Sequence, residues 1–141
     1  TKSQNRDGMF YTPEMSRRAR SIELWAALHY LGKDGVDELV YGLHQRALQI
    51  GKELKAEGFL LLNDIVFNQV LIACDTDALT NQTMQNIQQS GECWAGGAQW
   101  AGKAVIRISV CSWVTGETDI TRTVRAFVTA RNKAVEDLEM A

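Results

Sequence analysis

Residues 103–113, KAVIRISVCSW, alternate in the manner of a β-strand with two different faces. Ile106, Ile108 and Val110 share one face, as a strand that packs against a hydrophobic core requires. The opposite face carries Arg107, an always-charged side chain in the middle of an apolar run. Two interpretations are open. The arginine stem can lie along the sheet with its head in water, or the guanidinium can bind something planar and negative.

Two helices are predicted before the first strand. The first begins at Pro13, or at Ser16 as N-cap, and ends at Gly32. Its apolar residues, which include Ile22, Trp25 and Leu28, occupy much of its circumference. We therefore expect other protein segments to pack against more than one side of this helix.

The second helix has Asp34 as its expected N-cap and Gly58 as its left-handed stop. Its apolar side chains recur at helical spacing and form one stripe: Val36, Leu39, Val40, Leu43, Ala47, Ile50 and Leu54.

Two short strands are expected in residues 59–62 and 66–74, around a turn at Asn63 and Asp64. A third helix should then begin at Asp75 or Asp77 and end at Gly91. Its weak apolar stripe consists of Leu79, Met84 and Ile87.

Glycines interrupt the strand-like pieces that follow. Gly96 and Gly97 indicate a bulge or a loop, and Gly102 and Lys103 a tight turn. The acidic stretch TGETDI, residues 115–120, opens a last helix. The buried stripe expected on that helix is Ile120, Val124, Phe127, Val128, Val135 and Leu138.

This order of elements predicts an α+β fold, a two-layer sandwich in which helices cover one face of a small antiparallel sheet. With 141 residues, 45% of them hydrophobic, we expect one domain over residues 16–141. Residues 1–15 are polar and aperiodic, and we interpret them as the end of a preceding domain. A net charge of −2 favours neither nucleic acid nor a membrane as partner, and no apolar run approaches a membrane span.

The cysteines and histidines predict neither a metal site nor a disulfide framework. Cys74, Cys93 and Cys111 form no CxxC pair, so we expect buried free thiols in a reducing cytoplasm. His29 and His44 lie on separate helical segments without a partner at ligand spacing, which favours surface or hydrogen-bonded histidines over ligands or bases. No nucleophile elbow, phosphate loop or zinc-binding helix motif occurs. The basic run SRRAR indicates either partner carboxylates or a solvated helix face.

The chain resembles the C-terminal small domain of the group II pyridoxal-phosphate-dependent amino-acid decarboxylases. The resemblance runs in order through residues 7–40, 59–74, 91–113 and 115–120, and the SRR helix start and the arginine-bearing strand are its most specific parts. It implies fold type I, a homodimer, an amino-acid substrate and pyridoxal 5'-phosphate in the full-length enzyme. It also implies that Arg107 binds the substrate α-carboxylate, with Trp94, Gly96 and Gly97 lining the cleft.

The same resemblance indicates what the chain lacks. In the family a lysine preceded by histidine holds the cofactor and lies in the large domain. No His-Lys pair occurs here, and Lys2 follows Thr1. We therefore expect no catalytic residue in this chain, no covalent binding of the cofactor, and no activity without its own large domain. Alternatives are the small domain of another pyridoxal-phosphate enzyme, such as an aminotransferase, and a free-standing α+β interaction module.

Overall fold

The computed structural model describes residues 19–140, and its backbone forms two compact units, Thr1–Val36 and Asp37–Ala141. The sequence predicts the order helix, helix, strands, helix, strands and helix, and the structure keeps this order but joins the first two helices across a kink at Gly32. The expected segment 1–15 and the helix start at Pro13 or Ser16 lie outside the described residues. None of the helices within residues 19–140 is both long and apolar enough to cross a membrane.

Helix α1 spans Ser21–Ala56 and is broken at Gly32, whose φ of 63° and ψ of −172° are not helical. The break falls where the sequence predicts the first helix to end, because only glycine adopts this backbone conformation without steric cost. The expected N-cap at Asp34 is wrong, since the helical backbone resumes directly after Gly32 and Asp34 lies inside it.

The end of α1 follows the predicted pattern at Gly58, where φ is 89°. The amide of Gly58 donates to the carbonyl of Lys55 at 3.1 Å, and the amide of Phe59 donates to that of Leu54 at 3.0 Å. These two bonds are the pair that defines a Schellman motif, with buried Leu54 and Phe59 as its apolar contact. The chain therefore leaves the helix with its last carbonyls satisfied and enters the sheet.

Four strands form one antiparallel sheet in the order β1-β2-β4-β3. Their bounds are Leu60–Leu61 for β1, Gln69–Ala73 for β2, Gly96–Trp100 for β3 and Lys103–Ser109 for β4. As predicted, Asn63 organises the turn between β1 and β2: its side chain accepts from the amide of Leu71 at 2.8 Å and donates to the carbonyl of Gln69 at 3.1 Å. The predicted bulge or loop at Gly96 and Gly97 is wrong, because both residues pair in register with β4.

Helix α2 spans Asp77–Ser90 and ends at Gly91 as expected. Its N-cap is Thr76, whose hydroxyl accepts from the amide of Leu79 at 3.2 Å, so neither Asp75 nor Asp77 has that role. The carboxylate of Asp77 instead accepts from the amide of Ala104 at 3.1 Å and joins the helix start to β4.

Helix α3 spans Glu117–Glu139 and begins at the predicted acidic turn. The Asp119 carboxylate accepts from the amide of Gly116 at 2.9 Å, which satisfies a backbone donor at the helix start. The predicted stripe is correct for Ile120, Val124 and Phe127, and Val128 is partly buried against the same core. The last two members of the stripe are wrong. Val135 and Leu138 are exposed, and the small residues Ala130 and Ala134 are buried in their place, because α3 packs closely against α2 there.

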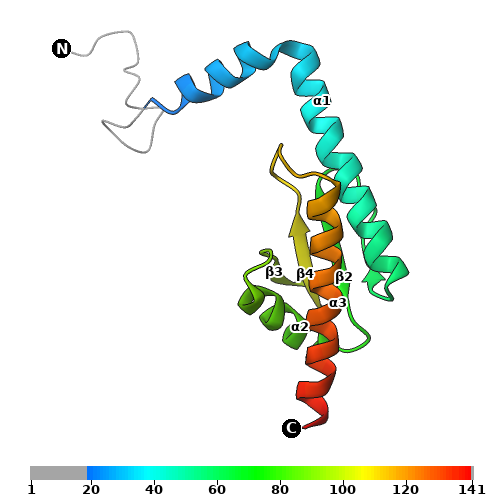
Figure 1. Ribbon diagram of the computed structural model, residues 1–141. Helices are drawn as coiled ribbons and strands as arrows, with labels where there is room; N and C mark the ends of the chain where they lie inside the picture. Colours follow the sequence, from blue (N-terminus) through cyan, green and yellow to red (C-terminus); the bar gives the residue numbers. More distant parts are fainter. Residues whose placement is uncertain (1–18, 141) are drawn as a thin grey trace, which may run out of the picture. The chain divides into compact units, whose positions relative to one another are not determined.

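All helices of the second unit lie on one face of the sheet, as the α+β two-layer prediction requires. The later part of α1 and helix α3 run side by side over the sheet in Figure 1. One core joins them to the inward face of β2 and β4. Its largest fully buried residues are Phe127, Leu54, Ile72, Ile87, Ile106, Ile120 and Val70.

The hairpin β3–β4 closes with a two-residue turn at Ala101 and Gly102, one position before the predicted turn. Both residues have positive φ, 49° and 77°, as a type I′ turn requires. Alanine pays a steric cost in this conformation that asparagine largely avoids.

We expect Ala101→Asn to raise the free energy of unfolding by about 0.5–1 kcal/mol, because it removes this cost without touching the core. Chemical denaturation of the 141-residue chain measures the change. Ala101→Val is the matched control and should destabilise, since a β-branched side chain suits positive φ least. Equal stability of the two variants would contradict the turn assignment.

Candidate functional site

The face of the sheet that carries Arg107 is the one that the helices leave open. Arg107 pairs with Leu71 on β2 and with Gly96 on β3, so the three residues form one row across the sheet. The next row, with Ile106 and Ile72, points to the opposite, buried face. Arg107 is therefore central in the sheet and directed away from the core.

The guanidinium of Arg107 has no hydrogen bond or ion pair to any residue in the range 19–140. Its Nη2 lies 3.9 Å from the point where a Cβ on Gly96 would stand, so the head group extends over the glycine backbone. Arg131 of α3 is a contrast. Its Nη1 donates to the carbonyl of Glu57 at 2.7 Å, and its guanidinium lies 4.5 Å from the ring centre of Phe59.

Of the residues predicted to line a cleft near Arg107, the structure brings only Gly96 beside it. Gly97 belongs to the opposite face, where a Cβ would collide with the sulfur of Met84 on α2. Trp94 precedes β3 and is 76% exposed. It lines a hollow of about 260 Å³ together with Ile50 of α1 and Phe127 of α3, so this hollow is on the helix side of the sheet and not on the face of Arg107.

A second hollow, of about 720 Å³, lies on the open face and was not foreseen from the sequence. Leu71, the cross-strand neighbour of Arg107, lines it together with Trp100 and Phe67. Its polar lining residues are Asn63, Asp64, Asn68 and Gln69. The alternation of side chains along β3 was sufficient to predict that Trp100 lies on this face. The residues before β2 that line the hollow have no periodic pattern, so the sequence did not predict their position.

A free guanidinium beside an apolar hollow suits a ligand that has a carboxylate. The planar fork of Arg107 matches the two oxygens of a carboxylate, and the exposed indole of Trp100 and the half-buried Leu71 offer apolar contact.

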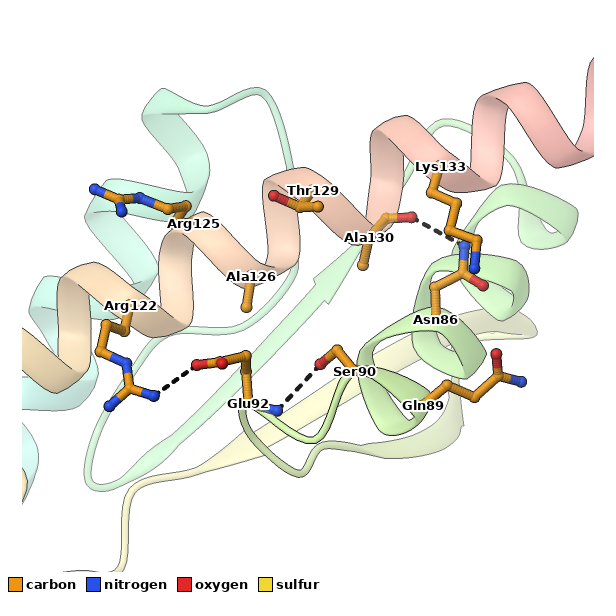
Figure 2. A pocket seen from close by; sticks show the side chains of 10 residues that line it. All are labelled: Asn86, Gln89, Ser90, Glu92, Arg122, Arg125, Ala126, Thr129, Ala130 and Lys133. Atoms are coloured by element: carbon orange, nitrogen blue, oxygen red, sulfur yellow. Dashed lines mark hydrogen bonds and ion pairs between the residues drawn. The ribbon is translucent and has the colours of Figure 1, made fainter.

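The groove between α2 and α3 is on the other side of the sheet and is a structural seam. Its volume is about 660 Å³. Figure 2 shows Arg122 directed at Glu92, 2.7 Å away, while Arg125 points away from α2. The side-chain amide of Asn86 donates to the carbonyl of Ala130 at 3.2 Å. These polar groups join the two helices to one another.

The thiols and imidazoles of the described chain offer no activated nucleophile or metal centre. Burial raises the pKa of the Cys74 thiol, which a hydrogen bond to Thr83 partly offsets, and burial also raises the pKa of the Cys93 thiol. Cys111 is exposed, so the expectation of three buried thiols is wrong for it. The His44 Nε2 donates to the carbonyl of Ile65 at 3.0 Å. Within residues 19–140, no three His, Cys, Asp or Glu side chains are grouped so that they could hold a metal ion.

We expect Arg107→Gln to leave the free energy of unfolding within about 0.5 kcal/mol, because no contact in the fold depends on its charge. Arg131→Gln is the matched control and should cost about 1–2 kcal/mol through the lost hydrogen bond and ring contact. Urea unfolding of both variants measures the difference. A large loss of stability for Arg107→Gln would identify Arg107 as a structural residue.

No protein-family model matches this sequence, whereas solved structures share its fold. TDC of Oryza sativa with pyridoxal phosphate is 16% identical with a TM-score of 0.78, over 90% of this chain and 30% of that one. Tryptophan decarboxylase of Catharanthus roseus is 16% identical with a TM-score of 0.74, over 84% of this chain and 26% of that one. The fold is that of part of a pyridoxal-phosphate decarboxylase.

The same fold also occurs in 4-hydroxyphenylacetaldehyde synthase of Rhodiola rosea, at 20% identity and a TM-score of 0.73, over 84% of this chain and 27% of that one. This chain thus spans less than a third of the length of these proteins. The comparison confirms the α+β small-domain architecture that the sequence resemblance predicted.

Proposed function

We propose that this chain is the C-terminal small domain of a pyridoxal-phosphate-dependent amino-acid decarboxylase and that Arg107 binds the substrate carboxylate. The observation that carries the proposal is the free guanidinium of Arg107 on the open face of a sheet with the decarboxylase fold. By holding the α-carboxylate in two parallel hydrogen bonds, the fork would orient the bonds of the substrate carbon toward the reacting group.

Pyridoxal phosphate does not fit the described residues by themselves. The cofactor needs a lysine that reaches its aldehyde carbon. Within residues 19–140, no lysine lines the hollow on the side of Arg107. We therefore assign the cofactor and the catalytic groups to a large domain, and we propose that this chain binds and orients the substrate. Gly96 belongs to the proposed cleft wall, whereas Trp94 and Gly97 do not lie beside Arg107 in this structure.

The first unit has an exposed apolar surface that indicates contact with another domain or subunit. Ile22, Trp25 and Leu28 are 63%, 64% and 48% exposed, an apolar stripe that soluble proteins seldom leave uncovered. We propose that the large domain and the second subunit of a cytoplasmic homodimer cover this stripe. The net charge of −2 favours neither nucleic acid nor an anionic membrane as the partner.

In the full-length enzyme, Arg107→Lys keeps the positive charge and loses the fork. We expect the variant to fold and bind cofactor normally while kcat/KM for the amino acid falls on the order of a hundredfold, or roughly 2–4 kcal/mol. Steady-state kinetics measures the loss.

The control ligand is the amine product, which lacks the carboxylate. We expect it to bind the Arg107→Lys variant almost as tightly as it binds the parent enzyme. If both ligands lost affinity equally and the variant were less stable, Arg107 would support the sheet and the assignment would be wrong.

We expect the 141-residue chain mixed with pyridoxal phosphate and borohydride to show only scattered labelling of surface lysines. Mass spectrometry after digestion measures the occupancy of each lysine. Stoichiometric labelling at one lysine would contradict the assignment of the cofactor to a large domain, because it would identify a lysine of this chain as the residue that binds the cofactor. The absence of a large domain from the upstream reading frame would favour the free-standing interaction module.

A further inference from the structure

Two of the cysteines line the same hollow at one end of the sheet. Cys93 precedes β3 and Cys111 follows β4, and both belong to the wall of the hollow of about 260 Å³ on the helix side. Cys93 is partly buried and Cys111 is exposed, whereas Cys74 is buried and does not line this hollow. The fold therefore groups two thiols that are distant from one another in the sequence.

The register of β3 and β4 brings the backbones of the two cysteines close together. Gly96 is opposite Arg107 in the last pair of the ladder. When this register is continued outward, Cys93 lies opposite Val110, the residue directly before Cys111. The spacing of paired strands and the rise of one residue along a strand then put the Cα atoms of the two cysteines about 6 Å apart, within the range of roughly 4.4–6.8 Å that a disulfide accepts.

Burial supports the continuation of the pairing beyond the ladder. Ala95 and Ile108, the next pair outward, are both buried, and Trp94 and Ser109 after them are both exposed. The amide of Val110 also donates to the carbonyl of the residue before β2 at 2.9 Å, as a strand residue does. The strand is therefore regular up to the second cysteine.

The connection between β4 and α3 allows Cys111 to reach the other thiol. Strict alternation would direct Cys111 to the face of Ser109, but β4 ends at Ser109, and Cys111 lines the helix-side hollow together with Ser112 and Thr115. Its sulfur accepts from the side-chain amide of Asn68 at 3.7 Å, a weak contact that a rotation about χ1 breaks. The sulfur can therefore turn into the hollow without unpairing the sheet.

We propose that Cys93 and Cys111 are a redox pair that hydrogen peroxide converts into an intrachain disulfide across this hollow. The Cys111 thiolate attacks peroxide, so that an S–O bond forms, the O–O bond breaks and hydroxide leaves. The Cys93 sulfur then attacks the sulfenic acid, so that the S–S bond forms and the S–O bond breaks. The released hydroxide takes the thiol proton of Cys93 and leaves as water. Two thiols are thus oxidised by two electrons, and one peroxide is reduced to two waters.

The order of the two steps follows from the exposure of the two thiols. Peroxide in solution reaches Cys111 because this side chain is exposed. Burial raises the pKa of the Cys93 thiol, and the nearby carboxylate of Glu92 acts in the same direction, so Cys93 has little thiolate to react with peroxide directly. Cys93 is therefore the resolving thiol. This proposal does not depend on the enzymatic assignment of the chain.

Peptide mapping of the folded 141-residue chain tests the pair. The chain is treated with increasing amounts of hydrogen peroxide, its remaining thiols are alkylated, and it is digested with trypsin and a protease that cuts after glutamate. The three cysteines then lie on separate peptides, residues 58–92, 93–103 and 108–117. We expect most chains to lose two free thiols and to show peptide 93–103 linked to peptide 108–117. The linked fraction should not depend on protein concentration, and dithiothreitol should release both peptides.

Single substitutions distinguish a redox pair from two independent thiols. In Cys93→Ser the link should be lost and Cys111 should accumulate as sulfenic acid, which dimedone traps, whereas the parent chain should trap little. In Cys111→Ser the Cys93 thiol should stay reduced. Cys74→Ala is the matched control and should form the link as the parent does, and circular dichroism shows whether each variant is folded.

Four results would each overturn the proposal. They are the absence of the link in the folded parent chain, a linked fraction that rises with protein concentration, a link that includes Cys74, and equal dimedone labelling of the parent and the Cys93→Ser variant.

Discussion

The central position of strand β4 determines how the rest of the second unit is arranged. It bonds to β2 on one side and to β3 on the other, so its backbone is satisfied within the sheet. Its side chains then divide by simple alternation. Ile106 and Ile108 anchor the helices, and Arg107 between them must face the other way. The exposure of this arginine is thus a direct consequence of packing, and no helix needs to be moved to reach it.

Two arginines of this chain illustrate how differently the same side chain is used. Arg131 joins the end of α1 to α3 through a carbonyl and an aromatic ring, and both of its contacts lie inside the fold. Arg107 has the same N–H donors, but none of them forms a hydrogen bond with the described residues. The packing of the described residues therefore gives no reason for an arginine at this position of the sheet.

Local patterns in the sequence were sufficient for much of the fold. The breaks at Gly32, Gly58 and Gly91 were predictable because positive φ at these positions leaves glycine as the best residue. The alternation in β4 and the acidic start of α3 were equally readable. The helix caps were misplaced locally, by one or two residues, whereas the errors at Gly96 and Gly97 and on α3 depend on packing between elements. Gly96 and Gly97 suggested irregular backbone, yet they are regular strand residues.

The site was predictable only in part for the same reason. Alternation placed Arg107 on its face, and the family resemblance supplied a role for it. The hollow lined by Leu71, Phe67 and Trp100 depends on a turn and two non-adjacent strands meeting on one surface, and no stretch of sequence contains that information. The burial of Ala130 and Ala134 in place of larger residues likewise depends on how closely α2 approaches α3.

Gly96 and Gly97 are neighbours in the chain, but a side chain added at each would meet a different face of the sheet. At Gly97 a Cβ would overlap the thioether of Met84, so a side chain there requires the flexible end of Met84 to move. At Gly96 the Cβ position is in ordinary van der Waals range of the Arg107 guanidinium, and the interior is indifferent to it. A substitution at residue 97 therefore changes the packing between the sheet and α2, whereas a substitution at residue 96 changes the open face. One dipeptide thus serves both surfaces of the sheet.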